Sequence, residues 1–364
     1  MPPLSLMIKP VSGACNLRCA YCFYCDEMEN RQTASYGFLS RETMEELVER
    51  ALAWAEGSCT FGFQGGEPTL WGLENFRAFT ECVRRHNKGN LQVNYFLQTN
   101  GYTLNREWAS FFREQGFLVG VSLDGTIHTH DRYRKDASGK GSFSRVMEGI
   151  GFLTEQQVPY NILTVVTRDV ALAVDRVYRF LRRQGFAHLQ FIPCLDPLEG
   201  GKDRSYSLTP EDYGSFLCRL FDLWYADLQR GIPVWIRQFD NYVDMLCGYE
   251  PEACDMRGQC GVNYVVEADG GVYPCDFYVL DQWRLGSFRE QSVGEIDRSR
   301  EKSGFLKGVP LPEKCLSCPY RPLCRGGCRR HRTGEGGLNC FCAAYEKFFA
   351  YSGDRLWRLA RARV

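Results

Sequence analysis

The sequence predicts an α/β fold, an open and partial (β/α)6 TIM-like barrel followed by a cysteine-rich C-terminal domain. Three observations predict it. Apolar runs of strand length alternate with helical stretches through the first 200 residues, which is typical of a parallel sheet covered by helices. Six such units are present, fewer than the eight of a closed barrel. Nine cysteines fall within residues 254–342, which indicates a separate metal-binding region.

Each unit of the predicted barrel begins with a short apolar run and continues into a stretch with apolar residues at helical spacing. In the helix expected at 41–55, Met44, Leu47 and Ala51 recur at this spacing, and the preceding Ser40 is placed to cap the N-terminus. The expected strands are 4–9, 60–64, 91–97, 117–122, 160–166 and 189–192, and the expected helices are 41–55, 73–86, 106–115, 143–156 and 174–184.

The rest of the chain predicts a helix, a hairpin and a closing helix. The helix is expected at 209–229, with Pro210 at its first helical position. A hairpin of 262–267 and 271–273 is expected around an Asp-Gly turn, and its open end would bring Cys260 and Cys275 together. The last helix is expected at 343–350. The predicted domains are therefore 1–200 for the barrel, 201–250 for a helical connection and 251–364 for the cysteine-rich domain.

Composition narrows the classes of partner and the compartment. The 44 Lys and Arg side chains balance 44 Asp and Glu side chains, so neither nucleic acid nor an acidic membrane is expected as the main partner. No run of 18 apolar residues is present, so no membrane span is expected, and the N-terminus does not resemble a signal peptide. We expect a cytoplasmic protein, whose eighteen cysteines indicate metal binding because cytosolic thiols stay reduced.

Three cysteines, Cys15, Cys19 and Cys22, form a C-x3-C-x2-C run directly after the first expected strand. A cubane iron–sulfur cluster normally takes four cysteines, so three on one loop predict a cluster with one iron open to another ligand. The alternative is part of a zinc site that is completed by Cys25 or by a remote residue.

Polar, glycine-containing loops follow the next three expected strands, at the edge where parallel α/β folds place their functional residues. In the first loop, Gly65 and Gly66 would let the backbone approach a ligand closely, and Glu67 could pair with an amine. A ligand with both an amino group and a carboxylate would fit, with Ser122 and Arg134 facing the carboxylate. Each loop taken alone could also be an ordinary turn.

The cysteine run, the aromatic residue inside it and the Gly-Gly-Glu-Pro loop resemble the radical S-adenosylmethionine (SAM) superfamily over residues 4–196. The resemblance implies that the open iron binds the amino and carboxylate groups of SAM, and that reductive cleavage yields a 5′-deoxyadenosyl radical. The SAM contacts that it implies are Tyr21, the amine-binding Gly65, Gly66 and Glu67, the carboxylate-binding Ser122 and Arg134, and Leu195 near the adenine.

The later cysteines resemble the SPASM extension of radical SAM enzymes, which carries two auxiliary [4Fe–4S] clusters, giving three clusters in all. Two zinc ions are the alternative by spacing alone. Cys340 competes with Cys342 for the last ligand position, and Cys342 is preferred because it directly precedes the closing helix. The resemblance implies Cys254, Cys260, Cys275 and Cys328 as ligands of the first auxiliary cluster, and Cys315, Cys318, Cys324 and Cys342 as ligands of the second.

Over nearly the whole chain, the segments around Phe63–Leu70, Leu97–Gly101 and Tyr273–Leu280 look like the anaerobic sulfatase-maturating enzymes. This resemblance implies oxidation of a cysteine or serine of a sulfatase polypeptide to Cα-formylglycine. Asp276 matches the family's base, and Tyr24 and Gln64 would line the substrate end of the cavity.

The implied partners are the sulfatase polypeptide, or another peptide substrate, and a reducing protein such as flavodoxin or ferredoxin. Two alternatives remain at this point. One is a SPASM maturase of a ribosomally made peptide that forms a thioether, a carbon–carbon cross-link or an epimer. The other is a non-catalytic zinc or electron-transfer protein.

Overall fold

The computed structural model describes residues 3–198, 204–308, 310–332 and 337–363. Its contacts divide the chain into two compact units. Unit 1 comprises Met1–Ser122, Asp131–Tyr160 and Val262–Phe305, and unit 2 comprises Leu123–His130, Asn161–Gly261 and Leu306–Val364. The domain boundary expected at residues 200 and 201 lies outside the described residues, and the expected domain ranges stay a prediction.

In unit 1, four parallel strands run in the order in which they occur in the chain. β1 (Leu4–Ile8), β2 (Ser58–Phe63), β3 (Gln92–Thr99) and β4 (Phe117–Ser122) pair in sequence. On its other side β1 pairs in parallel with β8 (Tyr264–Val266), which forms the expected hairpin with β9 (Gly271–Tyr273). The short β10 (Gly286–Ser287) closes that edge. The hairpin therefore extends the sheet of the first strands.

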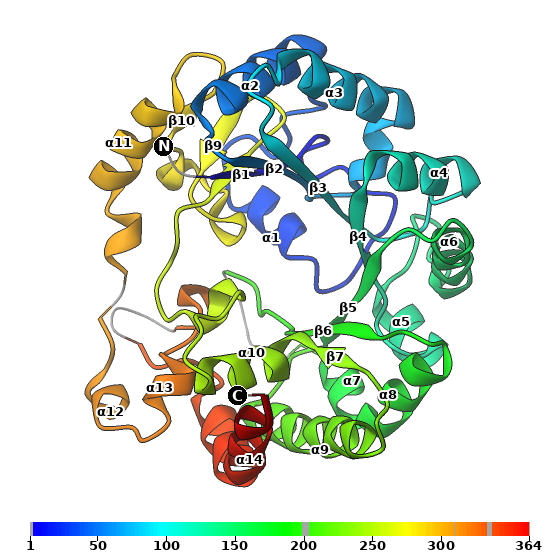
Figure 1. The fold of residues 1–364 in the computed structure, drawn as a ribbon, viewed down its shortest axis with the longest axis vertical. Coiled ribbons are helices and arrows are strands. Elements are labelled where there is room, and N and C mark those ends of the chain that lie inside the picture. Colours follow the sequence, from blue (N-terminus) through cyan, green and yellow to red (C-terminus); the bar gives the residue numbers. More distant parts are fainter. Residues whose placement is uncertain (1–2, 199–203, 309, 333–336, 364) are drawn as a thin grey trace. The chain divides into compact units, whose positions relative to one another are not determined.

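The helices of unit 1 lie on both faces of its strands. In Figure 1, α2 (Arg41–Trp54), α3 (Leu73–His86) and α4 (Arg106–Gln115) cover one face, whereas α1 (Phe23–Glu29) lies on the other. Ser40 caps α2 by accepting the Thr43 N–H, as expected. The remaining helical segments are α6 (Phe143–Glu155), α11 (Val293–Ser303) and the 3-10 turns η1 (Pro68–Trp71), η3 (Asp276–Tyr278), η4 (Asp281–Trp283) and η5 (Phe305–Lys307), the last of which begins at the final residue of unit 1.

An aromatic core holds β2 against the covering helices. The ring of Phe63, the last residue of β2, is fully buried, and its centroid lies 4.8 Å from that of Phe76 and 4.9 Å from that of Phe79. Trp71 packs edge-on against Phe76 at 5.3 Å. Such aromatic pairs stabilise a core by about 0.5–1.5 kcal/mol each beyond the area they bury. This packing fixes the point where the Gly-Gly-Glu-Pro loop leaves β2.

Unit 2 contains three further parallel strands, β5 (Tyr160–Val166, whose first residue belongs to unit 1), β6 (His188–Pro193) and β7 (Trp235–Ile236). The long helix α14 (Cys342–Arg363) packs against α9 (Pro210–Gln229) and α10 (Arg237–Leu246). The other helical segments are α7 (Arg168–Leu172), α8 (Val174–Arg183), α12 (Glu313–Leu316), α13 (Arg321–Cys324), the 3-10 turns η2 (Cys254–Met256) and η6 (Arg329–His331), and α5 (Ile127–Tyr133), which is shared between the units.

The strand–helix alternation was predicted correctly, and most predicted boundaries agree to within two residues. The predicted end of the last helix at residue 350 is wrong, because α14 continues to Arg363. Its buried residues Phe349, Leu356 and Ala360 recur at helical spacing, so packing continues along the whole helix. Cys342 opens this helix rather than preceding it. Among the described residues, no helix is long and apolar enough to cross a membrane.

Candidate active site

The cysteines of the C-x3-C-x2-C run lie on one loop between β1 and α1. N–H groups point at their sulfurs: Cys15 Sγ accepts from the Leu17 backbone at 3.4 Å and from Asn100 Nδ2 at 3.6 Å. Cys19 Sγ accepts from the Arg134 guanidinium at 3.9 Å. Hydrogen bonds to sulfur are among the features that tune protein-bound iron–sulfur clusters, so these donors fit a cluster held by this loop.

The third cysteine, Cys22, is the N-cap of α1. A hydrogen bond with the Cys25 thiol, assisted by the backbone N–H groups of Cys25 and Tyr24, lowers the pKa of Cys22 to about 6, although burial opposes the shift. A thiolate is the form of cysteine that binds metal, so the direction of this shift fits the predicted role of Cys22 as a ligand. Cys25 thus lies beside the third cysteine, and it is exposed.

The Gly-Gly-Glu-Pro loop lies directly against the cysteine loop. Gly65 and Gly66 both have positive φ angles, 96° and 54°. A Cβ atom at Gly66 would lie 2.2 Å from the Ala14 carbonyl oxygen, and that same oxygen accepts the Glu67 N–H at 2.8 Å. Glycine is therefore required here, because any side chain at Gly66 would separate the two loops.

The Glu67 carboxylate is fully buried and is surrounded by donors from the protein itself. One oxygen accepts from Thr69 Oγ1 at 2.6 Å, from the Thr69 N–H at 3.1 Å and from Thr99 Oγ1 at 2.8 Å. The other accepts the Asn100 N–H at 2.7 Å. Burial raises the pKa of Glu67, and these hydrogen bonds oppose that shift. The side chain of Glu67 thus ties the loop after β2 to the loop after β3.

The remaining SAM-contact candidates of unit 1 lie around the same edge of the sheet. Ser122, the last residue of β4, accepts a hydrogen bond from Gln98 Nε2 at 3.1 Å. The guanidinium of Arg134, which is largely buried, lies 5.4 Å from the ring centroid of Tyr21, inside the cysteine loop. The structure thus brings Tyr21 and Arg134 together at the cysteine loop.

Asp276, the predicted base, meets both predicted substrate-side residues. Its Oδ2 atom accepts the Tyr24 hydroxyl at 2.7 Å and Gln64 Nε2 at 3.1 Å. Its Oδ1 atom is buried and has no hydrogen-bond partner among the described residues. Burial raises the pKa of Asp276, whereas the ammonium of Lys9 and the Tyr24 hydrogen bond lower it. Oδ2 is therefore held in place by two hydrogen bonds, whereas Oδ1 can accept a further hydrogen bond or a proton.

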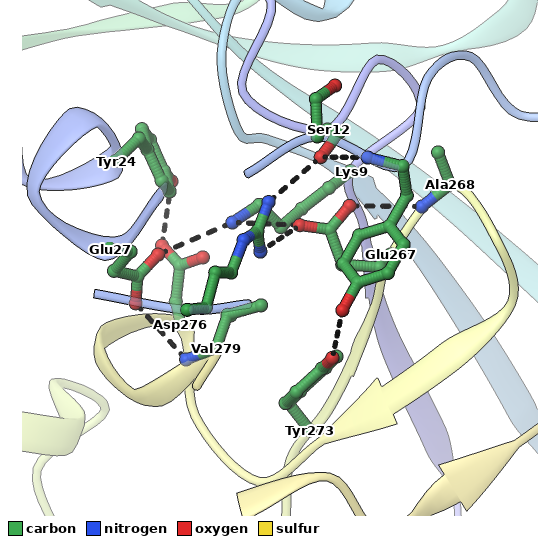
Figure 2. Close-up of polar contacts among 12 residues, drawn as sticks. Lys9, Ser12, Tyr24, Glu27, Glu267, Ala268, Tyr273, Asp276 and Val279 are labelled. Atoms are coloured by element: carbon green, nitrogen blue, oxygen red, sulfur yellow. Dashed lines mark hydrogen bonds and ion pairs between the residues drawn. The ribbon is translucent and has the colours of Figure 1, made fainter. Parts of the chain in front are cut away.

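This aspartate belongs to a charge cluster, whose members Lys9, Glu27 and Glu267 lie around it in Figure 2. The cluster consists of the buried residues Lys9, Glu27, Arg31 and Glu267 and the partly buried Asp276. Lys9 Nζ lies 3.4 Å from Glu27 Oε2 and 3.5 Å from Glu267 Oε1, and Arg31 Nη1 lies 2.8 Å from Glu267 Oε1. Three carboxyl groups and two cations are neutral together when one carboxyl group keeps its proton. In agreement, burial raises the pKa of Glu27 to about 8, against the opposing effect of Lys9.

Sequence reasoning missed Lys9, Glu27, Arg31 and Glu267 as functional residues. The first and last follow β1 and β8, and they meet because these strands pair in register, with the Lys9 N–H donating to the Val266 carbonyl at 2.8 Å. A charged residue directly after an apolar strand was the available signal. That signal could not identify the cluster, because the sequence did not show that β8 lies beside β1.

In unit 2, the four predicted ligands of the second auxiliary cluster line one small cavity, and Cys340 does not line it. Cys328 interacts electrostatically with Cys254 and Cys260, which brings together three predicted ligands of the other cluster; their fourth, Cys275, belongs to unit 1. Leu195 and Cys340 line a separate, larger cavity of unit 2. Within the part of the chain that the structure describes, no three His, Cys, Asp or Glu side chains converge on a single metal ion.

Comparison with known proteins identifies relatives along the full chain. The radical SAM superfamily matches residues 10–181, and an iron–sulfur cluster-binding domain matches residues 254–319. The chain is 45% identical to the cysteine-type anaerobic sulfatase-maturating enzyme of Clostridium novyi, over 99% of this chain and 98% of the relative. It is 31% identical to the serine-type enzyme of Bacteroides thetaiotaomicron, over 96% of this chain and 89% of the relative.

Solved structures agree with these matches. The structure of native anSMEcpe with bound AdoMet and Cp18Cys peptide superposes with a TM-score of 0.95 at 43% identity, and the match covers 100% of both chains. Streptococcus suis SuiB bound to S-adenosylmethionine has a TM-score of 0.62 at 17% identity, over 90% of this chain and 73% of SuiB, which shows a shared fold alone. The predicted fold class, a partial barrel with an iron–sulfur domain, is thereby confirmed.

Proposed function

Because the chain belongs to the anaerobic sulfatase-maturating enzymes of the radical SAM superfamily, we propose that it oxidises a cysteine of a sulfatase polypeptide to Cα-formylglycine. The observation that carries this proposal is the full-length identity of 44–45% to cysteine-type enzymes. Identity to the serine-type enzymes is only 29–31%. Cysteine is accordingly the proposed target residue.

We further propose that three [4Fe–4S] clusters and SAM are its cofactors. The first cluster would be held by Cys15, Cys19 and Cys22, whose sulfurs receive the hydrogen bonds described above. The proposed ligands of the two auxiliary clusters are Cys254, Cys260, Cys275 and Cys328, and Cys315, Cys318, Cys324 and Cys342. The cavity that the last four share supports Cys342 over Cys340.

For SAM, we propose that the amine is bound by the backbone of Gly65, Gly66 and Glu67. The Glu67 side chain already accepts four hydrogen bonds from the protein, so backbone carbonyl groups of this loop are the acceptors left for an ammonium. Ser122 and Arg134 would face the SAM carboxylate. The remaining proposed SAM contacts are Tyr21 in the cysteine loop and Leu195, which would lie near the adenine.

Asp276 is the proposed general base. When bound, the first cluster and SAM would supply the radical chemistry that removes a hydrogen atom from the substrate β-carbon, and the auxiliary clusters would serve as the acceptor for the remaining electron. Asp276 Oδ1 takes the thiol proton, because Oδ2 is engaged by Tyr24 and Gln64. Removal of one hydrogen atom, one proton and one electron leaves a carbon–sulfur double bond, which water hydrolyses to the aldehyde with release of hydrogen sulfide.

The proposed partners are a sulfatase polypeptide and a small reducing protein such as flavodoxin or ferredoxin. The structure of a relative with a bound cysteine peptide supports a peptide substrate. We propose the cytoplasm as the site of action, because the structure describes all eighteen cysteines and joins none of them in a disulfide, as is typical of a reducing compartment.

The test is anaerobic incubation of the cluster-loaded protein with SAM, a reductant and a pair of sulfatase-motif peptides that differ only by cysteine or serine. Formylglycine formation lowers the mass of the cysteine peptide by two hydrogens and by the exchange of sulfur for oxygen. We expect this product to form faster from the cysteine peptide. An unchanged mass with inverted stereochemistry, or a thioether of unchanged oxygen content, would contradict the proposal.

A further inference from the structure

Helix α1 and the turn that carries Asp276 contact each other in matching register. Tyr24 donates to Asp276 Oδ2 at 2.7 Å, and Glu27 Oε1 accepts the Val279 N–H at 3.1 Å. Each pair of partners is three residues apart on its own segment, so one turn of α1 faces one turn of η3. Between them, the Phe23 and Phe277 rings pack edge to face at 4.9 Å.

Lys9 contacts both hydrogen-bonding residues of α1. Its ammonium lies 3.4 Å from Glu27 Oε2 and 4.6 Å from the centroid of the Tyr24 ring (Figure 2). The aliphatic part of Lys9 passes against Gly65, where a Cβ atom would lie 2.7 Å from the lysine Cε. Lys9 therefore contacts Tyr24 and Glu27 of α1 from the end of β1, and its aliphatic part lies against the Gly-Gly-Glu-Pro loop.

Within this charge cluster, Lys9 is the cation whose charge acts on both Glu27 and Asp276. Arg31 is already engaged by Glu267 at 2.8 Å, by Ser12 Oγ and by the Ala34 carbonyl. Burial alone would lower the pKa of Lys9, but the surrounding carboxylates raise it above its usual value, so the side chain stays cationic. A buried carboxylate that loses its cation is strongly destabilised.

We propose that Lys9 and Glu27 are positioning residues for Asp276, which lock the turn carrying this aspartate onto the helix that begins at Cys22. The proposal rests on the proposed function, in which Asp276 is the base. The cysteine loop and the base are then parts of one rigid body within unit 1. A base held in this way is in place at the moment when the substrate β-carbon loses its hydrogen atom.

The locking contacts predict a specific failure when they are removed. SAM cleavage depends on the cysteine loop, and proton removal depends on the position of Asp276. Loss of the contacts made by Lys9 and Glu27 should therefore leave SAM cleavage intact, but less of the substrate radical should be converted to formylglycine. The measurable sign is more 5′-deoxyadenosine per formylglycine, where the intact enzyme should give one of each per turnover.

The variants are Lys9→Met, Glu27→Ala and Glu27→Gln. The glutamine keeps an oxygen that can accept the Val279 N–H, whereas alanine does not, so the pair separates the hydrogen bond from the charge. The double variant Lys9→Met with Glu27→Gln removes the Lys9 ammonium together with its Glu27 partner, and it keeps the inference testable if a single variant does not fold. Leu47→Ala, which opens a cavity beneath the buried face of helix α2, is the control for destabilisation alone.

Two measurements are made on each cluster-loaded variant. The first is the ratio of 5′-deoxyadenosine to formylglycine. We expect it to rise about 10- to 100-fold in Lys9→Met and Glu27→Ala, because a misplacement of about 1 Å has an effect of this size. The second is hydrogen exchange at the Val279 amide, which should accelerate in Glu27→Ala and less in Glu27→Gln. Leu47→Ala should leave the ratio unchanged.

A wild-type ratio in folded Lys9→Met and Glu27→Ala, or equal losses of both products, would overturn the inference. Exchange at Val279 that is unaffected by Glu27→Ala would overturn it as well. Failure of the proposed function would give a different result. The wild-type protein itself would then produce 5′-deoxyadenosine without formylglycine, while hydrogen exchange at Val279 would still accelerate in Glu27→Ala.

Discussion

The two oxygens of Asp276 have different surroundings, and this difference makes its role testable. In Asp276→Asn the side chain can still accept from Tyr24 and Gln64 through its amide oxygen, but it can no longer take a proton. We expect SAM cleavage to continue and formylglycine formation to fall by about 10²- to 10⁴-fold, the usual contribution of a general base. Quantification of both products checks this, and full oxidation by the variant would remove Asp276 from its role.

Glu27 gives a pH prediction at the same scale. Burial raises its pKa from 4.5 to about 8, so between these values the folded chain holds a proton that the unfolded chain has released. The stabilising contribution is present below pH 4.5 and is lost as the pH rises through 8. Glu27→Gln has no such proton. Urea unfolding at pH 4.5 and pH 8 should therefore show that the free energy of unfolding of the wild type falls relative to that of the variant as the pH rises. An equal change in both proteins would contradict this.

Single residues could be proposed from the sequence where a motif marked them, but not where only packing brings them together. Cys15, Glu67 and Asp276 stand in recognisable segments, so the resemblance named them as candidates. Lys9 and Glu27 are one lysine and one glutamate among 88 charged side chains, and nothing local distinguishes them. Their importance follows from burial and from mutual contact, which are properties of the folded chain.

At the scale of elements, the contact between the cysteine loop and the Gly-Gly-Glu-Pro loop depends on Gly66. Gly66→Ala would place a methyl group 2.2 Å from the Ala14 carbonyl oxygen, so the two loops must separate. We expect destabilisation by about 1–3 kcal/mol and weaker SAM binding. Calorimetry of SAM binding and thermal unfolding check this.

Gly116→Ala is the matched control for that variant. Gly116 ends α4 in the same left-handed region, with φ +70°, and a Cβ atom there would meet nothing within 4 Å. This variant should show only the cost of backbone strain and should leave SAM binding unchanged. Equal effects of the two substitutions on SAM binding would show that close loop contact is unimportant.

The helices and strands were predictable from the periodicity of the hydrophobic residues, but the pairing of the strands was not. Helices α3 and α4 and strands β4 and β5 begin and end where the hydrophobic pattern predicts. The hairpin of β8 and β9 was also expected, yet its parallel pairing with β1 was not. Local pattern specifies a strand, whereas the choice of its neighbour depends on contacts between residues that are 258 positions apart in the case of Leu6 and Tyr264.

For the whole molecule, cofactor content is the test that covers both units. Three [4Fe–4S] clusters require about twelve iron and twelve sulfide ions per chain. Cys342→Ala should lose about four of each, because Cys342 shares its cavity with Cys315, Cys318 and Cys324. Cys340→Ala, a substitution only two residues away, should retain all of them. Iron and sulfide analysis after anaerobic reconstitution decides between them, and the opposite result would reassign the last ligand.

The Glu67 carboxylate accepts four hydrogen bonds from the protein, and this has a consequence for engineering the enzyme. If main-chain atoms bind the amino group of SAM, then substitution of nearby side chains should not change the affinity for that amino group. Variants meant to accept modified analogues should instead leave this acidic residue untouched and vary the adenine end around Leu195. By the same proposal, recognition of the adenine would depend on side chains, which can be enlarged or shortened without disturbing the contact between the two loops.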